Sequence, residues 1–403
     1  MTWSIYENKY DLIPFIDKHP GGKEILQKTK DMGDITPLFE SYHAFSNKDS
    51  LRKHLEHYKI EGSSESSYDF KLYDELSHRI KTNYNLSRTT MKATPLKQVY
   101  VMSILICYIV LSYVCLLDLN VALEVVLGTL LGLLWVSLGF NVMHDASHYA
   151  LFRSPKLNNY ASKLWHPIAT WNHDIWFYQH VLSHHSFTNT DKDVDAHHLQ
   201  PLLRKHKDQR RGWLPLHAFP LLSCIAPGFY FGQSIGYLLS PILFGTVLWS
   251  KLKIPRINYS IMDMLLILMR IKFFYEMGMW SSLSHMVANN LLYQANIVGD
   301  HDTYDVSVEN HYEGNDWLKL QIQNSGNFKT DCPIYTFVFG GINYQIEHHL
   351  FPSMSNSYYS QIAPTVKEFC KEHDIPYVEH HSLLEVFQQY YKTLKYFNSK
   401  KNL

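Results

Sequence analysis

The sequence lacks the features that mark secreted and nucleic-acid-binding proteins. Its five cysteines are scattered and form no Cys-x-x-Cys pair, so we expect neither a disulfide framework nor a cysteine metal site, and a reducing, cytosol-facing compartment. Basic and acidic residues number 37 each, so the formal net charge is zero and no nucleic acid partner is expected. The first twenty residues hold no apolar run, which predicts no cleaved signal peptide. Membrane targeting must then come from internal segments.

Histidine, in contrast, is abundant, with 24 among 403 residues, and three short boxes, HDASH, HVLSHH and QIEHH, hold seven of them. In the first two boxes, two histidines stand four residues apart, which places both on one face of a helix. Neutral imidazole suits iron, copper or zinc. A single such pair is more often a core or surface feature, but three boxes together predict a two-metal site. The predicted ligands are His144, His148, His180, His184, His185, Gln345, His348 and His349.

Other histidines are not expected to be ligands. The doublets at 197–198 and 380–381 are predicted to be surface loop residues, and His166 and His173 to lie at the membrane interface or beside the ligands. Five aromatic residues precede the second box, and they fit either an amphipathic helix in the interface or a soluble aromatic core. These residues are Trp165, Trp171, Trp176, Phe177 and Tyr178.

Two apolar segments precede the first box. Residues 98–117 carry no charge and are long enough for a transmembrane helix, and residues 121–143 carry only Glu124. The short turn at 118–120 predicts a helical hairpin that returns the chain to its starting side. The first box would then stand where the second helix leaves the bilayer, within reach of a lipid chain.

Two further stretches without charge, 212–250 and 277–299, lie between the second and third boxes. Proline and glycine interrupt the first, which would be one span plus a re-entrant or surface piece. Boxes that share metal ions must lie on one side of the membrane, so the number of crossings must be even, and two is the economical number. The basic residues within 150–211 place that side in the cytosol by the positive-inside rule.

Residues 1 to about 62 are polar and lead into a Gly/Ser/Glu segment typical of a linker, which predicts a small separate domain. At its centre is His19-Pro-Gly-Gly22, and His43 follows 24 residues after His19. This pattern resembles the haem-binding core of cytochrome b5. The resemblance implies that His19 and His43 are the axial ligands of a haem b used for electron transfer. The first strand and helix of that family have no counterpart ahead of Trp3, so we expect weak packing and easy loss of haem.

The three boxes with their apolar hairpins resemble the membrane fatty acyl desaturase and hydroxylase superfamily over nearly the whole chain. Gln345 in place of the first histidine of the third box, together with the fused haem pattern, resembles the front-end desaturases. The resemblance implies a mainly α fold with four transmembrane helices and a cytosolic catalytic cap, plus a small α+β haem domain. It divides the chain into a cytochrome b5-like domain at 1–62, a linker and pre-membrane segment at 63–95, and a membrane desaturase domain at 96–403.

The resemblance also implies a di-iron centre, held by the box residues given above. The family uses one more histidine after the last span, commonly following a Gln-x-Asn pattern, but here Gln294-Ala-Asn296 is followed by Ile297. His301 is the nearest substitute, and His285 is the other candidate.

The implied reaction inserts a cis double bond between an existing double bond and the carboxyl end of a polyunsaturated acyl chain carried by coenzyme A or a phospholipid. It consumes O2 and electrons that pass from NADH through cytochrome b5 reductase and the haem. We expect a multi-pass protein of the endoplasmic reticulum membrane, and residues 400–403 resemble a dilysine retrieval signal or form a solvated basic tail. A sphingolipid desaturase, a fatty acyl hydroxylase and a catalytically degenerate haem or iron protein are the alternatives.

Overall fold

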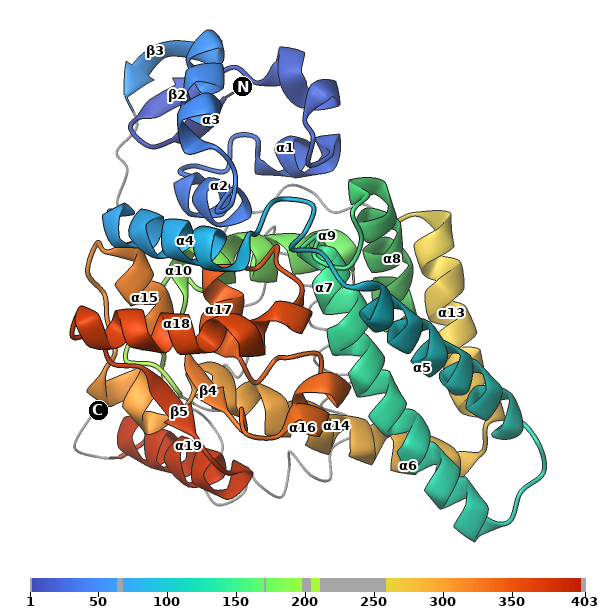
Figure 1. Cartoon of the computed structure of the whole chain (residues 1–403). Coiled ribbons are helices and arrows are strands. Elements are labelled where there is room, and N and C mark those ends of the chain that lie inside the picture. The colour runs from blue at the N-terminus through green and yellow to red at the C-terminus, as the bar shows by residue number, and fades with distance from the viewer. Residues whose placement is uncertain (1, 64–67, 170–171, 198–203, 211–258, 400–403) are drawn as a thin grey trace.

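The computed structural model describes residues 2–63, 68–169, 172–197, 204–210 and 259–399. The described chain is mainly helical with two small sheets, which confirms the predicted fold class at that level. Figure 1 shows a small N-terminal unit at the top, a body of helices below it, and a group of longer helices that extends to one side.

The N-terminal unit, residues 2–63, combines a three-stranded antiparallel sheet with short helices. The strands pair in the order β1, β2, β3, with Trp3 opposite Tyr10. Its elements are β1 (Trp3–Ile5), β2 (Asn8–Tyr10), α1 (Lys23–Thr29), α2 (Thr36–Tyr42), α3 (Lys48–Leu55) and β3 (Lys59–Ser63), with 3-10 turns at Ile13–Lys18 and Glu56–Tyr58.

The N-terminal unit shares a hydrophobic core with the second box. Trp3 and Ile5 are buried in the same cluster as Trp176, Val181 and Leu182. Full burial of one such side chain contributes roughly 1.5–3 kcal/mol. The segment that we expected to be a separate domain is therefore packed against the helix that carries the second box, and this contact supplies packing partners that its own short sequence lacks.

A hairpin of two apolar helices follows, as predicted from residues 98–117 and 121–143. These helices are α5 (Pro95–Val114) and α6 (Val121–Leu138), and both are long and apolar enough to cross a membrane. The Asn120 side chain accepts a hydrogen bond from the backbone of Leu123 and caps α6. Glu124 accepts one from the backbone N–H of Trp280 at 3.2 Å. Glu124, the one charged residue of the second predicted span, thus caps the N-terminus of the helix that contains Trp280.

That other helix is α14 (Met279–His301), and it forms a second hairpin with α13 (Ile261–Glu276). Figure 1 shows the α13–α14 junction beside the turn between α5 and α6. Helix α14 corresponds to the predicted helix at 277–299, and it approaches α6 so closely that a Cβ on Gly132 would lie 2.7 Å from the His285 carbonyl oxygen. The sequence did not suggest α13, because Asp263, Arg270 and other charges interrupt its apolar residues. The stretch 212–250 lies outside the described residues.

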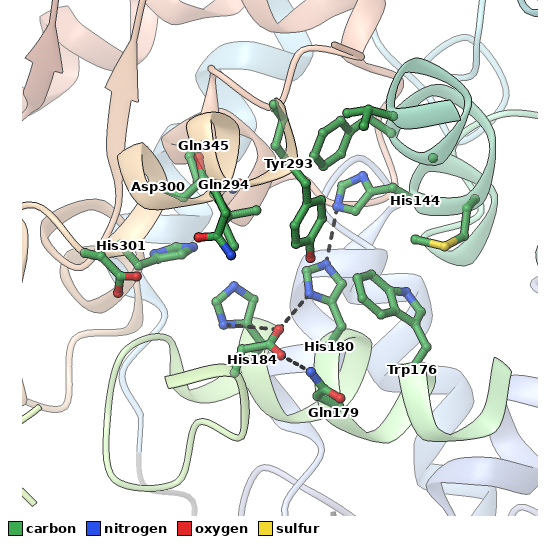
Figure 2. A pocket seen from close by; sticks show the side chains of 18 of the residues that line it. His144, Trp176, Gln179, His180, His184, Tyr293, Gln294, Asp300, His301 and Gln345 are labelled. Carbon is green, nitrogen blue, oxygen red and sulfur yellow. Dashed lines mark hydrogen bonds and ion pairs between the residues drawn. The ribbon is translucent and has the colours of Figure 1, made fainter. Parts of the chain in front are cut away.

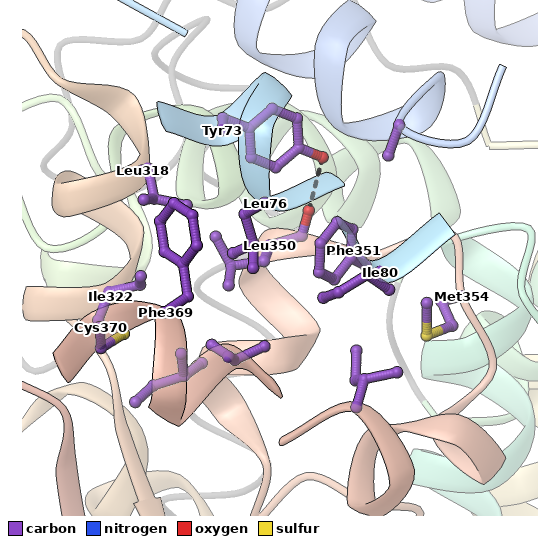
Figure 3. Packing of buried hydrophobic residues seen from close by; sticks show 14 of the residues in the cluster. Tyr73, Leu76, Ile80, Leu318, Ile322, Leu350, Phe351, Met354, Phe369 and Cys370 are labelled. Carbon is purple, nitrogen blue, oxygen red and sulfur yellow. Dashed lines mark hydrogen bonds between the residues drawn. The ribbon is translucent and has the colours of Figure 1, made fainter. Parts of the chain in front are cut away.

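The body of helices surrounds the third box. Its elements are α4 (Lys71–Tyr84), α7 (Asp145–Ser147), α8 (Pro155–Ile168), α9 (His173–Trp176), α10 (His185–Phe187), α15 (Trp317–Gln323), α16 (Pro333–Val338), α17 (Gln345–Leu350), α18 (Tyr359–Glu372) and α19 (Leu383–Phe397). Strands β4 (Gly326–Phe328) and β5 (Val378–His380) pair in parallel, and 3-10 turns occupy Asp195–His197 and Asn356–Tyr358. Figure 3 shows the core, in which Leu76 of α4 packs with Leu318 of α15 and Phe369 of α18. The Tyr73 hydroxyl donates to the Leu350 carbonyl at 2.8 Å, which ties α4 to the end of α17.

The aromatic residues ahead of the second box lie in the interior. Trp165, Trp176, Phe177 and Tyr178 are all buried and belong to hydrophobic clusters. The core alternative is therefore correct for these four, and Trp171 lies outside the described residues.

His380 departs from the loop prediction. It is buried in β5, and its two ring nitrogens lie 3.4 Å from carboxylate oxygens of Glu385 and Asp305. This prediction was wrong because a histidine doublet does not indicate a strand. The two carboxylates near the His380 ring come from other segments of the chain and cannot be inferred from the doublet. His381 is exposed as predicted, His197 ends a 3-10 turn, and His198 lies outside the described residues.

Candidate active site

The first box lies where α6 changes its winding. The helix continues as a π-helical turn, Gly139–His144, and then as α7, so that His144 and His148 both face inward and are buried. Their ring centroids are 4.8 Å apart. π-turns inside α-helices occur frequently at functional sites. The box is thus built on the end of an apolar helix, as predicted, with a winding that the spacing did not suggest.

The second box has the same construction. A π-helical stretch, Phe177–His184, joins α9 to α10, and the rings of His180 and His184 stack with centroids 5.1 Å apart. His180 Nδ1 lies 3.0 Å from an Asp195 oxygen, and His184 Nδ1 lies 2.9 Å from an Asp193 oxygen. Each carboxylate accepts the Nδ1 proton, so Nε2 of each ring is left to bind a metal.

The two aspartates also set the charge states of these histidines. Burial lowers the pKa of His180 to about 4, while its bond to Asp195 opposes that shift. Burial also opposes a charge on His184, but the Asp193 carboxylate outweighs it and raises the pKa of His184 above its usual value. Burial would raise the pKa of Asp195, but hydrogen bonds and nearby histidines hold that pKa below its usual range.

The third box lies on α17 and approaches the first through two glycines. Gly340 and Gly341 both have φ +66°, and a Cβ on Gly340 would lie 3.0 Å from the backbone of Phe140. A β-carbon at this position would disfavour both the conformation and the contact. The turn therefore brings His348 and His349 against the π-turn of the first box.

The histidines of the third box are also held through Nδ1. The distance from His348 Nδ1 to the Tyr359 hydroxyl is 3.1 Å, and that from His349 Nδ1 to Gln321 Oε1 is 2.9 Å. In the first box, His148 Nδ1 lies 2.9 Å from the hydroxyl of Tyr42, which belongs to the N-terminal unit. Tyr42, Gln321 and Tyr359 were not predicted, because no local pattern links them to the boxes.

The box histidines converge into two groups. In each group, one ligand atom per residue lies within 4.8 Å of the others. The first group is His144, His148, His180 and His348, and the second is His184, His301 and His349. His185 lies between them, with ring centroids 4.4 Å from His148 and 4.3 Å from His349. The seven predicted histidines are therefore brought together with His301.

Several of these rings have a buried nitrogen without a hydrogen-bond partner in the described part of the chain. A buried polar atom left unpaired costs about 1–3 kcal/mol. The atoms are Nε2 of His148, His301, His348 and His349 and both ring nitrogens of His185. Since the opposite nitrogen is already bonded in four of the five residues, the free Nε2 atoms are arranged as a set of metal ligands.

The two candidates for the further histidine have different positions. His301 closes α14, its ring centroid lies 4.6 Å from those of His184 and His349, and its Nδ1 donates to the Asn324 carbonyl at 2.8 Å. His285 lies farther back along α14, where its Nε2 is 3.2 Å from an Arg270 nitrogen. The geometry thus favours His301 over His285.

Three other residues of the sequence prediction stay outside the two groups. His166 and His173 both contact the Ser162 hydroxyl, and the ring centroid of His166 lies 5.8 Å from that of Trp176. Gln345 lines the cavity next to the histidines, and Figure 2 shows it beside Asp300 and Gln294. Its role as a ligand stays a prediction.

The cavity beside the histidines has an apolar side and a polar side. Trp135, Phe140 and Met143 of the α6 segment line the apolar side together with Trp165 of α8 and Ile297 of α14. At the polar side, Lys205 Nζ lies 2.8 Å from an Asp302 oxygen. Figure 2 shows His180 and His184 in the lower half of the view, Tyr293 next to His144 above them, and His301 at the left. The arrangement suits a long apolar molecule with a polar end.

A second pair of histidines lies in the N-terminal unit. The ring centroids of His19 and His43 are 6.2 Å apart, and their Nδ1 atoms lie 2.9 Å from the Gly22 carbonyl and 2.7 Å from the Phe39 carbonyl, respectively. A Cβ on Gly21 would lie 2.7 Å from the His19 ring. Both predicted residues are thus brought together, with space for one metal atom between the rings.

Replacing Asp193 by asparagine tests whether its charge supports metal binding by the two histidine groups, which we call the metal groups. We expect Asp193→Asn to weaken metal binding about 10–100-fold, because the group that accepts the Nδ1 proton of His184 loses its charge. Metal content after dialysis against graded chelator concentrations measures the effect. Asp191→Asn, at an exposed position two residues earlier, is the control. Equal metal retention in the two variants would contradict the role given to Asp193.

Comparison with known proteins places this geometry in a family. Residues 119–381 match the family model for fatty acid desaturase. The chain belongs to the fatty acid desaturase family. It is 25% identical to the acyl-lipid (8-3)-desaturase of Mortierella alpina over 96% of this chain and 91% of that protein. It is 26% identical to the probable Delta(5) fatty acid desaturase C of Dictyostelium discoideum, over 91% and 85%. It is 25% identical to the Delta(8)-fatty-acid desaturase 2 of Arabidopsis thaliana, over 93% and 85%.

The predicted resemblance to front-end desaturases is therefore confirmed. This desaturase is an oxidoreductase that acts on fatty acyl chains, and its family is membrane-bound and di-iron. The two histidine groups are among the clusters of the described chain that could bind such metal ions.

Proposed function

We propose that this desaturase inserts a cis double bond between an existing double bond and the carboxyl end of a polyunsaturated acyl chain. The observation that carries the proposal is the convergence of seven histidines into two groups, with His185 between them, beside a cavity with an apolar side. The regiochemistry is supported by the names of relatives, which are Delta(5) and Delta(8) desaturases.

Two irons would be held by the two histidine groups, with His185 between them. The unpaired Nε2 atoms and the imidazole-rich set suit iron, and the bound irons would supply the oxidising power with which O2 removes hydrogen from an unactivated methylene. The chain's own part is to fix each ring through Nδ1 and to exclude water. Trp176 serves the second purpose, since its ring stacks on His180 with centroids 4.3 Å apart.

The acyl chain would enter the apolar side of the cavity, and its polar carrier would stay near the cytosolic mouth. The carrier is coenzyme A or a phospholipid. Trp135 and Trp165 stack at 4.7 Å within the lining, and Trp135 is backed by the guanidinium of Arg270 at 4.1 Å. This stack is suited to limit the depth that a chain can reach.

Four membrane crossings fit this arrangement. Helices α5 and α6 would form the first hairpin, and α13 and α14 the second, with both histidine-bearing ends on the cytosolic face of the endoplasmic reticulum. Many apolar side chains of α13 are exposed, among them Ile261, Leu265 and Leu268, as expected for a helix that faces lipid.

The N-terminal unit would carry a haem b between His19 and His43. The ring separation, the close approach that Gly21 permits and the apolar cavity around the pair all fit a six-coordinate haem, which supplies electrons one at a time. Cytochrome b5 reductase would deliver these electrons from NADH. Residues 1–62 would then be the haem-binding part, 63–95 a connecting segment, and 96–403 the desaturase part.

Expression in yeast fed with defined acids tests the proposed function. Linoleic, linolenic and twenty-carbon trienoic acids are supplied separately, and mass spectrometry locates the new double bond. We expect a bond on the carboxyl side of the existing ones, because the carrier held at the mouth fixes the distance from the head group to the irons. A bond on the methyl side, activity on stearoyl chains alone, or a hydroxylated product would contradict the proposal and leave the metal groups intact.

A further inference from the structure

A large cavity lies between the N-terminal unit and the rest of the chain. His19, Gly21, Phe39 and His43 line it from the N-terminal unit. Arg88 and Lys92 of the connecting segment line its other side, together with Tyr149 and Arg153 of the desaturase part. Residues beyond the N-terminal unit thus form part of the wall of the proposed haem site.

The side of this cavity that lies beyond the N-terminal unit is cationic. Arg88, Lys92 and Arg153 are all basic, and none of the described residues that line the cavity is an aspartate or a glutamate. Arg88 Nη1 donates to the carbonyl of Pro20, inside the His-Pro-Gly-Gly turn, at 3.1 Å. Lys92 Nζ donates to the Ser353 carbonyl at 2.9 Å. These cations therefore face a cavity whose described lining offers no carboxylate as a countercharge.

Lys92 has an unfavourable environment in the absence of an anion. Burial, together with the nearby charge of Arg88, lowers the pKa of Lys92 to about 7. A lysine with a carbonyl as its hydrogen-bond partner loses hydration without gaining a countercharge. A carboxylate in the cavity would restore its charge and pair with Arg88 as well.

We propose that Arg88 and Lys92 bind the propionate carboxylates of the haem whose axial ligands are His19 and His43. The proposal rests on the haem function proposed above. A haem has a flat apolar macrocycle with two carboxylates on one edge, and the cavity offers the matching surfaces: apolar residues of the N-terminal unit and cations of the connecting segment.

This placement makes the haem site an interdomain site. Residues beyond position 63 would complete the pocket that His19 and His43 begin.

The test compares full-length, haem-loaded variants. We expect Lys92→Met and Arg88→Gln each to release haem to excess apomyoglobin about tenfold faster, and the double variant faster still. The low-spin spectrum should be unchanged because His19 and His43 stay in place. The reduction potential should fall, since a cation that disfavours the ferric state has been removed. Lys92→Arg, which keeps the charge, should behave as wild type, and Lys53→Met, at an exposed position of the N-terminal unit, is the control.

The outcomes separate the two proposals. A haem-loaded wild type whose double variant releases haem at the same rate would overturn the propionate site alone. A wild-type protein that takes up no haem when haem is supplied in excess would overturn the haem function as well.

Discussion

Replacing His184 by alanine is expected to abolish desaturation without loss of the protein. His184 is one of three histidines in the second metal group, and its ring also lies 5.1 Å from that of His180. Its removal leaves His301 and His349 as the histidines of that group. Since loss of a supporting hydrogen bond alone costs about 10–100-fold, loss of a ligand should lower turnover by more than about 100-fold.

The measurement pairs product analysis with metal analysis. Desaturated product is quantified in yeast fed with an accepted polyunsaturated acid, and iron is counted per purified chain. We expect about two irons in the wild type and fewer in His184→Ala. His381→Ala removes an exposed histidine and serves as the control. Substantial product from His184→Ala, or zinc in place of iron in the wild type, would refute the di-iron assignment.

The box histidines were predictable because their chemistry is local. Two histidines four residues apart face the same side of any helical segment, and an apolar stretch next to them shows where that segment lies. The π-turns at Gly139–His144 and Phe177–His184 were not predictable, since one extra residue in a helical turn depends on packing against the other boxes. The residues that bond to Nδ1 could not be found either, because Gln321 and Tyr359 reach the site through the tertiary fold.

Helix α13 was not predicted, because its apolar run is interrupted by charged residues. Arg270 interrupts its apolar run, yet this side chain is buried and bonded to the Tyr108 hydroxyl at 2.7 Å, with its guanidinium over the Trp135 ring. These partners lie on other helices. The sequence of α13 alone is therefore too polar to predict a membrane-spanning helix. The core that the N-terminal unit shares with Trp176 could not be predicted either, because its partners lie far apart in the sequence. The aromatic run around Trp176 fits a membrane interface and a core equally well.

Tyr42 joins the N-terminal unit to a histidine of the first group. Its hydroxyl lies 2.9 Å from Nδ1 of His148, and the next residue is His43, the predicted haem ligand. If the unpaired Nε2 of His148 binds a metal, Nδ1 carries the proton and donates it to the tyrosine oxygen. A residue of the N-terminal unit would then hold a proposed ligand of the desaturase part in its metal-binding tautomer.

We expect Tyr42→Phe to lower iron affinity about 10–100-fold while the haem spectrum stays unchanged. The phenylalanine keeps the ring and its packing but leaves the His148 Nδ1–H without an acceptor. Free cytochrome b5 is supplied in the turnover assay, so that electron delivery does not limit the comparison. Iron retained against graded chelator is the primary readout, and excess iron should restore most of the turnover.

The matched control is Tyr58→Phe, in the same unit, where the ring packs against Phe15 and His54. Iron that dissociates equally slowly from Tyr42→Phe, Tyr58→Phe and the wild type would show that the bond to His148 does not position the ligand. Iron loss confined to Tyr42→Phe, reversed by added iron, would show that the N-terminal unit is part of the metal site. In that case a free electron donor could not replace the unit in full, because its loss would also remove the partner of His148.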